Sequence, residues 1–234
     1  FHGQREILES HFGMKNLFYD NDALKFYCLC YIQVRFRKLL MSIFFEEIKQ
    51  EYVDNFLKDI SYNIYVFEYN SLPDQKIQKI FFNDTFAPSK GLLEKISDIY
   101  QFLEIASEYF RDKARYIHER KKVKIRQFDE ISSEDNRARK FRYFNEIVIQ
   151  YNDLLADFIV QGSYGDGTAL RCWSDFDFVA ILKKEIFFDK KLFKLATKKL
   201  PKLSAIYYLL DPLTHHNIEI LTAFDLDFYP QALL

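Results

Sequence analysis

Cysteine, long apolar runs and an excess of charge of one sign are all scarce in this sequence. The three cysteines, Cys28, Cys30 and Cys172, are too few for a disulfide framework, which indicates a reducing compartment and predicts a cytoplasmic protein. No uninterrupted apolar stretch reaches the roughly 18 residues of a membrane-spanning helix, so we expect no membrane partner. The net charge of −1 gives no reason to expect a nucleic-acid coat protein or a binder of acidic lipids.

The sequence is rich enough in apolar residues to bury a substantial core. Hydrophobic residues make up 49% of the 234 residues and charged residues 29%, which excludes a disordered chain. The residue pattern changes near residues 127–135. We therefore predict an α+β protein with a mostly helical region over residues 1–128 and a second domain, built around a sheet flanked by helices, over residues 129–234.

In the first region, apolar residues at three- and four-residue spacing predict helices over residues 22–48 and 92–117. Residues 52–69 fit either a helix or a strand. In the second region the pattern predicts a helix over 137–155, strands over 157–161 and 175–182, and a helix over 187–200 that Pro201 ends. Two further strands are predicted over 205–210 and 218–222, joined by a polar loop over 211–217.

A glycine-rich segment directly follows the first predicted strand. Three of the six glycines lie within residues 162–167, and Ser163 follows the first of them. Glycines at a strand end let the backbone turn with positive φ and approach a ligand closely, and N–H groups there can bind phosphate oxygens. An ordinary turn is the alternative interpretation of this segment.

Asp175 and Asp177 begin the next predicted strand. Residues two apart on a strand project to the same side, so the two carboxylates repel each other unless a cation lies between them. Oxygen ligands suit Mg²⁺ or Mn²⁺, and paired divalent ions promote phosphoryl and nucleotidyl transfer. A solvent-facing strand edge is the alternative for an isolated Asp-x-Asp pair.

Together, Gly162-Ser163, an eleven-residue spacer and the strand that begins at Asp175 resemble the signature of the polymerase-beta-like nucleotidyltransferase superfamily. The resemblance covers roughly residues 133–222, and a looser likeness in residues 211–216 and 228–230 points to a bacterial branch. It implies that Gly162 and Ser163 hold the phosphates of a nucleoside triphosphate such as ATP. It also implies that Asp175 and Asp177 bind Mg²⁺ or Mn²⁺.

In the superfamily a third acid on a later strand completes the metal site, and Glu219 occupies that place in the sequence, so the resemblance implies that it binds the metal together with Asp175 and Asp177. Asp211 is the rival, although an aspartate before proline is more simply a turn residue, and Asp225 and Asp227 fall in a predicted following loop. Arg171 and Lys183 are candidates for contacting the triphosphate, but Lys183 and Lys184 are also interpretable as a solvated strand end. The implied reaction transfers a nucleoside monophosphate to an unidentified hydroxyl of a protein, an RNA or a small molecule and releases pyrophosphate.

A basic segment precedes the second domain. Its eight cations are Arg111, Lys113, Arg115, Arg120, Lys121, Lys122, Lys124 and Arg126. Within it, Arg111 and His118 resemble the Arg-spacer-His element of HEPN ribonuclease-like domains, which accompany small nucleotidyltransferases in toxin–antitoxin pairs. A toxin-type partner and RNA binding are therefore two hypotheses for this segment, and a solvated helix end is the third.

A non-catalytic role remains the alternative for the whole chain. In that case the fold serves as a nucleotide sensor or as an antitoxin-like interaction module. The position of Glu219 relative to Asp175 and Asp177 separates the two functions.

Overall fold

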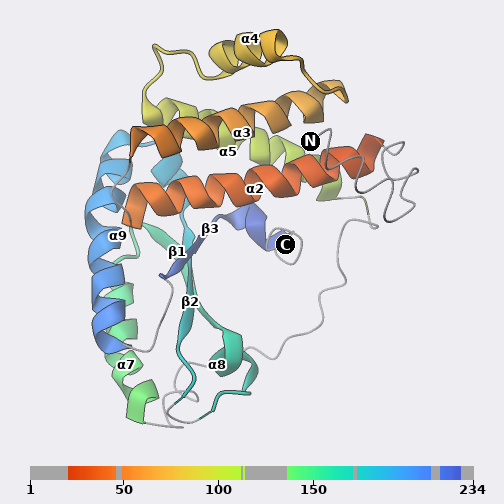
Figure 1. Ribbon diagram of the computed structural model, residues 1–234. Coiled ribbons are helices and arrows are strands. Elements are labelled where there is room, and N and C mark those ends of the chain that lie inside the picture. Colours follow the sequence, from red (N-terminus) through yellow and green to blue (C-terminus); the bar gives the residue numbers. More distant parts are fainter. Residues whose placement is uncertain are drawn as a thin grey trace.

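The computed structural model describes residues 21–45, 49–111, 113, 136–170, 173–211 and 217–227. Helices and a small three-stranded sheet make up this part of the chain, so the predicted α+β class is confirmed (Figure 1). The predicted domain boundary at residues 128 and 129 lies outside the described residues. Within these ranges no helix is both long enough and apolar enough to cross a bilayer.

The described residues between 21 and 111 form helices α2 (Asn21–Phe45), α3 (Gln50–Tyr69), α4 (Gln75–Thr85) and α5 (Leu92–Arg111). The ambiguous segment 52–69 is helical because its apolar residues recur every three or four positions. Val53, Leu57, Ile60 and Ile64 are all buried on one face of α3. Helix α4 was not predicted from the sequence. Asp74 caps its N-terminus, because the Asp74 carboxylate accepts the Ile77 N–H at 2.8 Å.

The sheet contains β1 (Leu155–Gln161), β2 (Asp177–Leu182) and β3 (Glu219–Leu221), in that order across the sheet. β1 and β2 are antiparallel and β2 and β3 are parallel, which makes the sheet mixed. Helix α7 (Asn136–Ile149) precedes β1, α8 (Gly162–Asp166) joins β1 to β2, and α9 (Lys190–Leu210) joins β2 to β3. Two 3₁₀-helices, η2 (Lys184–Phe187) and η3 (Ala223–Asp227), follow β2 and β3.

The predictions around Pro201 were wrong. Helix α9 continues through Pro201 to Leu210, so the predicted strand over residues 205–210 is the last part of this helix. A proline inside a helix costs about 3 kcal/mol because it removes one hydrogen bond and clashes with the preceding turn. Leu200, Leu203 and Tyr207 are fully buried on one side of α9, and their burial offsets this cost.

The two faces of the sheet have different surroundings. Phe178 of β2 packs against Phe144 of α7 and Tyr207 of α9, at centroid distances of 5.3 and 5.4 Å. This face therefore belongs to the main core, which continues into the N-terminal helices. Among the described residues, the opposite face carries a small separate apolar cluster of Val179, Ile181 and Leu221. Helix α2 contacts both α9 and β3, and in Figure 1 it crosses beyond the end of the sheet that holds β3.

Candidate functional site

The glycine–serine turn and the second aspartate lie against each other. Asp177 is the register partner of Gln161, the last residue of β1, so Gly162 follows directly beside it. Gly162 has a φ of 65°, and a Cβ at this position would lie 2.1 Å from Oδ2 of Asp177. Only glycine leaves room for the Asp177 carboxylate here while adopting this left-handed backbone conformation. The structure thus brings together two residues that lie 15 positions apart in the sequence.

Ser163 belongs to a compact turn rather than to a long helix. Its carbonyl oxygen accepts N–H groups from Gly167 and from Thr168, the latter at 2.9 Å. Gly167 ends the turn with a φ of 82°. Tyr164, one residue further on, is buried and stacks on Phe176 with a centroid distance of 3.9 Å. Aromatic stacking therefore fixes the turn to the segment that precedes β2.

Asp175 and Asp177 flank the buried Phe176. The N–H of Phe176 donates to Oδ2 of Asp211 at 2.8 Å, and its carbonyl oxygen accepts the hydroxyl of Tyr207. Regular strand structure begins at Asp177 instead of at the predicted residue 175. Phe176 therefore anchors this segment to the core. The two aspartates on either side of it are half-buried and remain partly accessible to solvent.

Glu219 is the first residue of β3 and is the register partner of Val179. Since Val179 and Asp177 are two residues apart on β2, the side chains of Glu219 and Asp177 lie on the same face of the sheet. Oε1 of Glu219 is 3.2 Å from a guanidinium nitrogen of Arg37, and Oε2 accepts the side-chain amide of Gln161 at 3.4 Å. The predicted third acid therefore lies on the expected face, but it contacts Arg37 and Gln161.

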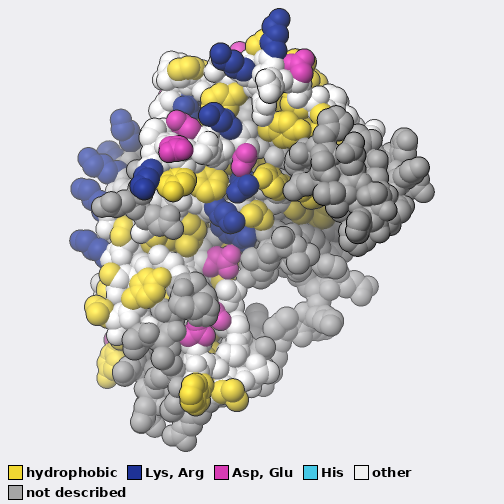
Figure 2. Space-filling model, in the orientation of Figure 1, with side chains coloured by type: hydrophobic (Ala, Val, Ile, Leu, Met, Phe, Trp, Pro, Cys, Tyr) yellow, Lys and Arg dark blue, Asp and Glu magenta, His cyan; other side chains and the backbone are white. Residues whose placement is uncertain are grey.

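Arg37 was not foreseen, because a single arginine in an amphipathic helix carries no recognisable signal. It is 8% exposed and comes from α2, far from the sheet in the sequence. Figure 2 shows the general arrangement, with Lys and Arg side chains over α2 and acidic side chains below them over the strands.

Two of the other acids considered in the sequence are buried. Asp225 lies in η3, where Oδ2 accepts the N–H and the hydroxyl of Thr222, each at 2.7 Å. Burial raises the pKa of Asp225 to about 6, against the opposing effects of the Thr222 hydrogen bonds and the charge of Arg37. Asp211 ends α9 and, through its bond to Phe176, supports the segment that holds Asp175. The side chain of Asp227 lies outside the described part.

The structure does not bring Lys183 to the aspartates. Lys183 follows the last residue of β2 and Asp177 is the first, so about six residues, or roughly 20 Å of extended chain, separate them. The Lys183 N–H donates to the carbonyl of Leu154, and the neighbouring Lys184 pairs with Glu104 at 2.5 Å. Arg171 falls outside the described residues, so its role in phosphate binding stays a prediction.

The acidic side chains do not form a complete metal cage. In the described ranges, no three His, Cys, Asp or Glu residues are grouped closely enough to hold a metal ion. Mg²⁺, however, is commonly bound by one or two carboxylates together with substrate phosphates. Asp175 and Asp177 are both half-buried, so two carboxylates of this kind are present on adjoining parts of the chain.

Most of the basic segment lies outside the described residues, including His118 and all its cations beyond Lys113. Of the two that are described, Arg111 ends α5 and lies 3.9 Å from Glu108. Lys113 pairs with Asp22 at 2.7 Å, and this hydrogen bond raises the pKa of its ammonium group. Both cations thus make ion pairs at or just after the end of α5, which agrees with the interpretation of this segment as a helix end.

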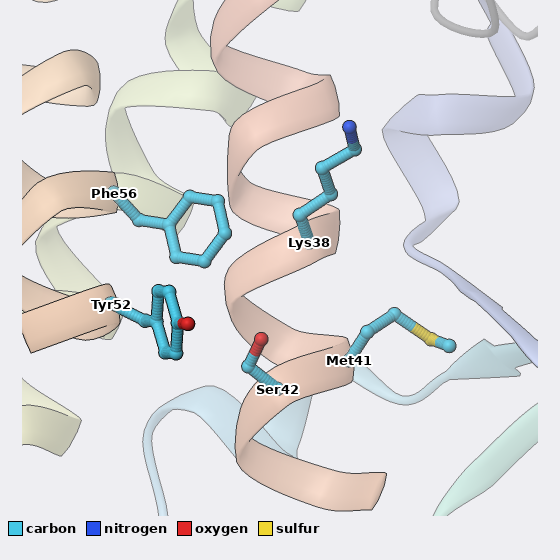
Figure 3. Close-up of a pocket in the computed structure, with 5 residues that line it drawn as sticks. All are labelled: Lys38, Met41, Ser42, Tyr52 and Phe56. Atoms are coloured by element: carbon cyan, nitrogen blue, oxygen red, sulfur yellow. The ribbon is translucent and has the colours of Figure 1, made fainter. Parts of the chain in front are cut away.

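A surface pocket of about 390 Å³ lies between α2 and α3. Lys38, Met41 and Ser42 of α2 line it together with Tyr52 and Phe56 of α3 (Figure 3). The two aromatic rings face Ser42, while the Lys38 ammonium group points away from them. The pocket is therefore an open, largely apolar hollow.

Comparisons with protein-family models, with curated proteins and with solved structures found no match.

Proposed function

We propose that the protein is a metal-dependent nucleotidyltransferase. The observation that carries the proposal is the contact between Asp177 and Gly162, which joins an acidic strand start to a tight glycine–serine turn. Glu219 supports it, because this acid lies on the same face of the neighbouring strand. A turn for phosphates beside acids for a divalent cation is the arrangement that a nucleoside triphosphate requires.

Each residue then has a defined task. Backbone N–H groups of the turn and the Ser163 hydroxyl bind phosphate oxygens, and Asp175 and Asp177 hold Mg²⁺ or Mn²⁺ against the triphosphate. The cation, when bound, neutralises phosphate charge and favours departure of pyrophosphate. Asp177 accepts the proton of the acceptor hydroxyl, whose oxygen attacks the α-phosphate. The acceptor is a protein, an RNA or a small molecule.

Isothermal titration with ATP, CTP, GTP and UTP in the presence of Mg²⁺ tests this function. We expect the wild type to bind at least one of them and the Asp175→Ala/Asp177→Ala double variant to lose about 100-fold in affinity or more. Asp157→Asn is the matched control, because this exposed acid lies on the same face of the sheet, opposite Ile181. Absence of binding by the wild type, or equal binding by the double variant, contradicts the proposal.

A second candidate function is a nucleotide sensor or an antitoxin-like module without transfer activity. The ion pair between Glu219 and Arg37 favours it, since a cation already neutralises the acid that would complete a metal site. The two functions differ in turnover. A coupled assay for pyrophosphate, run with each nucleotide and with candidate acceptors, separates an enzyme from a protein that only binds.

A further inference from the structure

Two different parts of the protein hold the carboxylate of Glu219. Arg37 of α2 lies 3.2 Å from one carboxylate oxygen, and the amide of Gln161, at the end of β1, donates to the other at 3.4 Å. Because Arg37 is 8% exposed, the helical region reaches the sheet face with a buried cation.

The bond from Gln161 fixes the direction in which Glu219 points. Gln161 and Glu219 belong to the two outer strands, with β2 between them, so the contact spans two strand spacings of about 4.8 Å each. It therefore passes over β2, on the face where Asp177 is the register partner of Gln161. Glu219 is thus drawn over the sheet toward Asp177 instead of out to solvent.

Arg37 interacts with more than one carboxylate. Asp225 is buried in η3, and its carboxylate interacts electrostatically with both Arg37 and Glu219. Without the guanidinium group, the two carboxylates would repel each other and Glu219 would turn away. A second arginine on the same helix offers a comparison, because Arg35 also lies 3.2 Å from an acid, Asp59, but joins α2 only to α3 and is more exposed.

We propose that Arg37 is a positioning residue of the nucleotide site, which holds the Glu219 carboxylate on the sheet face of Asp177. The inference rests on the proposed nucleotide-binding function. Helix α2 then contributes a residue to the nucleotide site, so the site includes side chains from both the helical region and the sheet.

The test measures binding of a non-hydrolysable ATP analogue with Mn²⁺ by isothermal titration. We expect Arg37→Gln to weaken binding about tenfold or more, because Glu219 loses the buried cation of its ion pair. Arg37→Lys keeps the charge and restores most of the affinity, and Arg35→Gln leaves it unchanged. In a Glu219→Gln background, Arg37→Gln has no further effect, a coupling that a purely structural role does not produce.

The results separate this inference from the function on which it rests. Wild-type binding that Asp177→Asn abolishes, together with wild-type-like or tighter binding by Arg37→Gln, overturns the role of Arg37 and leaves the function intact. Failure of the wild type to bind overturns the function itself. If Arg37→Gln alone does not fold, the Arg37→Gln/Glu219→Gln double variant, which leaves neither partner of the ion pair as an unpaired charge, is compared with Glu219→Gln, and a further loss of affinity overturns the proposal.

Discussion

The two faces of the three-stranded sheet use alternate residues of the same strands for different purposes. On β2, Phe178, Ala180 and Leu182 face the main core, whereas Val179 and Ile181 belong to a small separate cluster on the opposite face. Asp177 begins this second face, and Glu219 lies beside it on β3. One face thus supplies apolar burial and the other presents charged groups. A substitution on one face can therefore be made without directly altering the side chains of the other face.

The comparison also shows how differently the faces are closed. Helices α7 and α9 cover the apolar face with aromatic contacts, such as that between Phe178 and Tyr207. On the polar face, the contacts include an ion pair from α2 and a hydrogen bond from Gln161. Apolar packing is non-directional and stabilises the fold, whereas the polar contacts fix the orientation of particular groups.

Phe178→Ala gives the largest expected effect on stability. The ring is buried between α7 and α9 and stacks on Phe158 with a centroid distance of 4.9 Å. Its removal leaves a cavity in the main core and should lower the free energy of unfolding by about 3–5 kcal/mol. Urea denaturation followed by far-ultraviolet circular dichroism measures this change.

The matched variant on the other face is Asp177→Asn, which should abolish nucleotide binding while changing the free energy of unfolding by less than about 1 kcal/mol. If Phe178→Ala instead weakens nucleotide binding per folded molecule as strongly as Asp177→Asn, the two faces are not independent.

Asp225 predicts a pH-dependent stability on the polar side. Its folded pKa of about 6 lies above the ordinary value of 3.8, so the folded protein holds a proton that the unfolded chain releases. The stabilisation is fully present below pH 4 and is lost as the pH rises through 6, by on the order of 3 kcal/mol. Asp225→Asn retains an acceptor for Thr222 and cannot ionise, so its unfolding free energy should lack this decrease.

Thermal and urea unfolding of both proteins between pH 3.5 and 7.5 gives the difference curve. Carboxylates that do not interact with Asp225 contribute equally to the two proteins and cancel in the difference. A difference that stays flat across this range would show that Asp225 ionises normally in the folded state.

Gly162→Ala tests the contact on which the candidate site depends. The added methyl group would lie 2.1 Å from the Asp177 carboxylate at a φ of 65°, which costs about 1–2 kcal/mol in stability and displaces the carboxylate. Gly91→Ala is the control, since its methyl group would meet Glu94 at an ordinary 3.6 Å. Titration with nucleotide and Mg²⁺ should show loss of binding in the first variant alone, and equal affinities would separate the turn from the site.

Local patterns in the sequence were sufficient to predict part of this arrangement. The period of two in β2 and the glycines after β1 indicated where a strand and a turn lie, and the structure places both there. The resemblance to the superfamily signature implied that the glycine–serine turn and Asp177 belong to one site, and in the structure Gly162 lies beside Asp177.

These local patterns could not predict contacts between segments that lie far apart in the sequence. The ion pair between Arg37 and Glu219 depends on how α2 crosses the sheet, which no spacing within either segment encodes. The buried role of Asp211 depends in the same way on its bond to Phe176, 35 residues away. Tertiary burial also overrode the local preference of Pro201, and the sequence analysis therefore ended α9 too early.

Pro201→Ala gives the smallest expected effect and acts only through the helix that covers the apolar face. Alanine restores an N–H donor for the carbonyl of Thr197, four residues earlier, and removes the clash of the proline ring. The unfolded chain gains freedom at the same time, so we expect a net stabilisation of about 1 kcal/mol. Urea denaturation measures it, and nucleotide affinity should stay unchanged because α9 packs on the face opposite Asp177. A destabilised variant would mean that the proline ring itself contributes to packing. A changed nucleotide affinity would mean that a substitution in a helix on the apolar face alters the polar face.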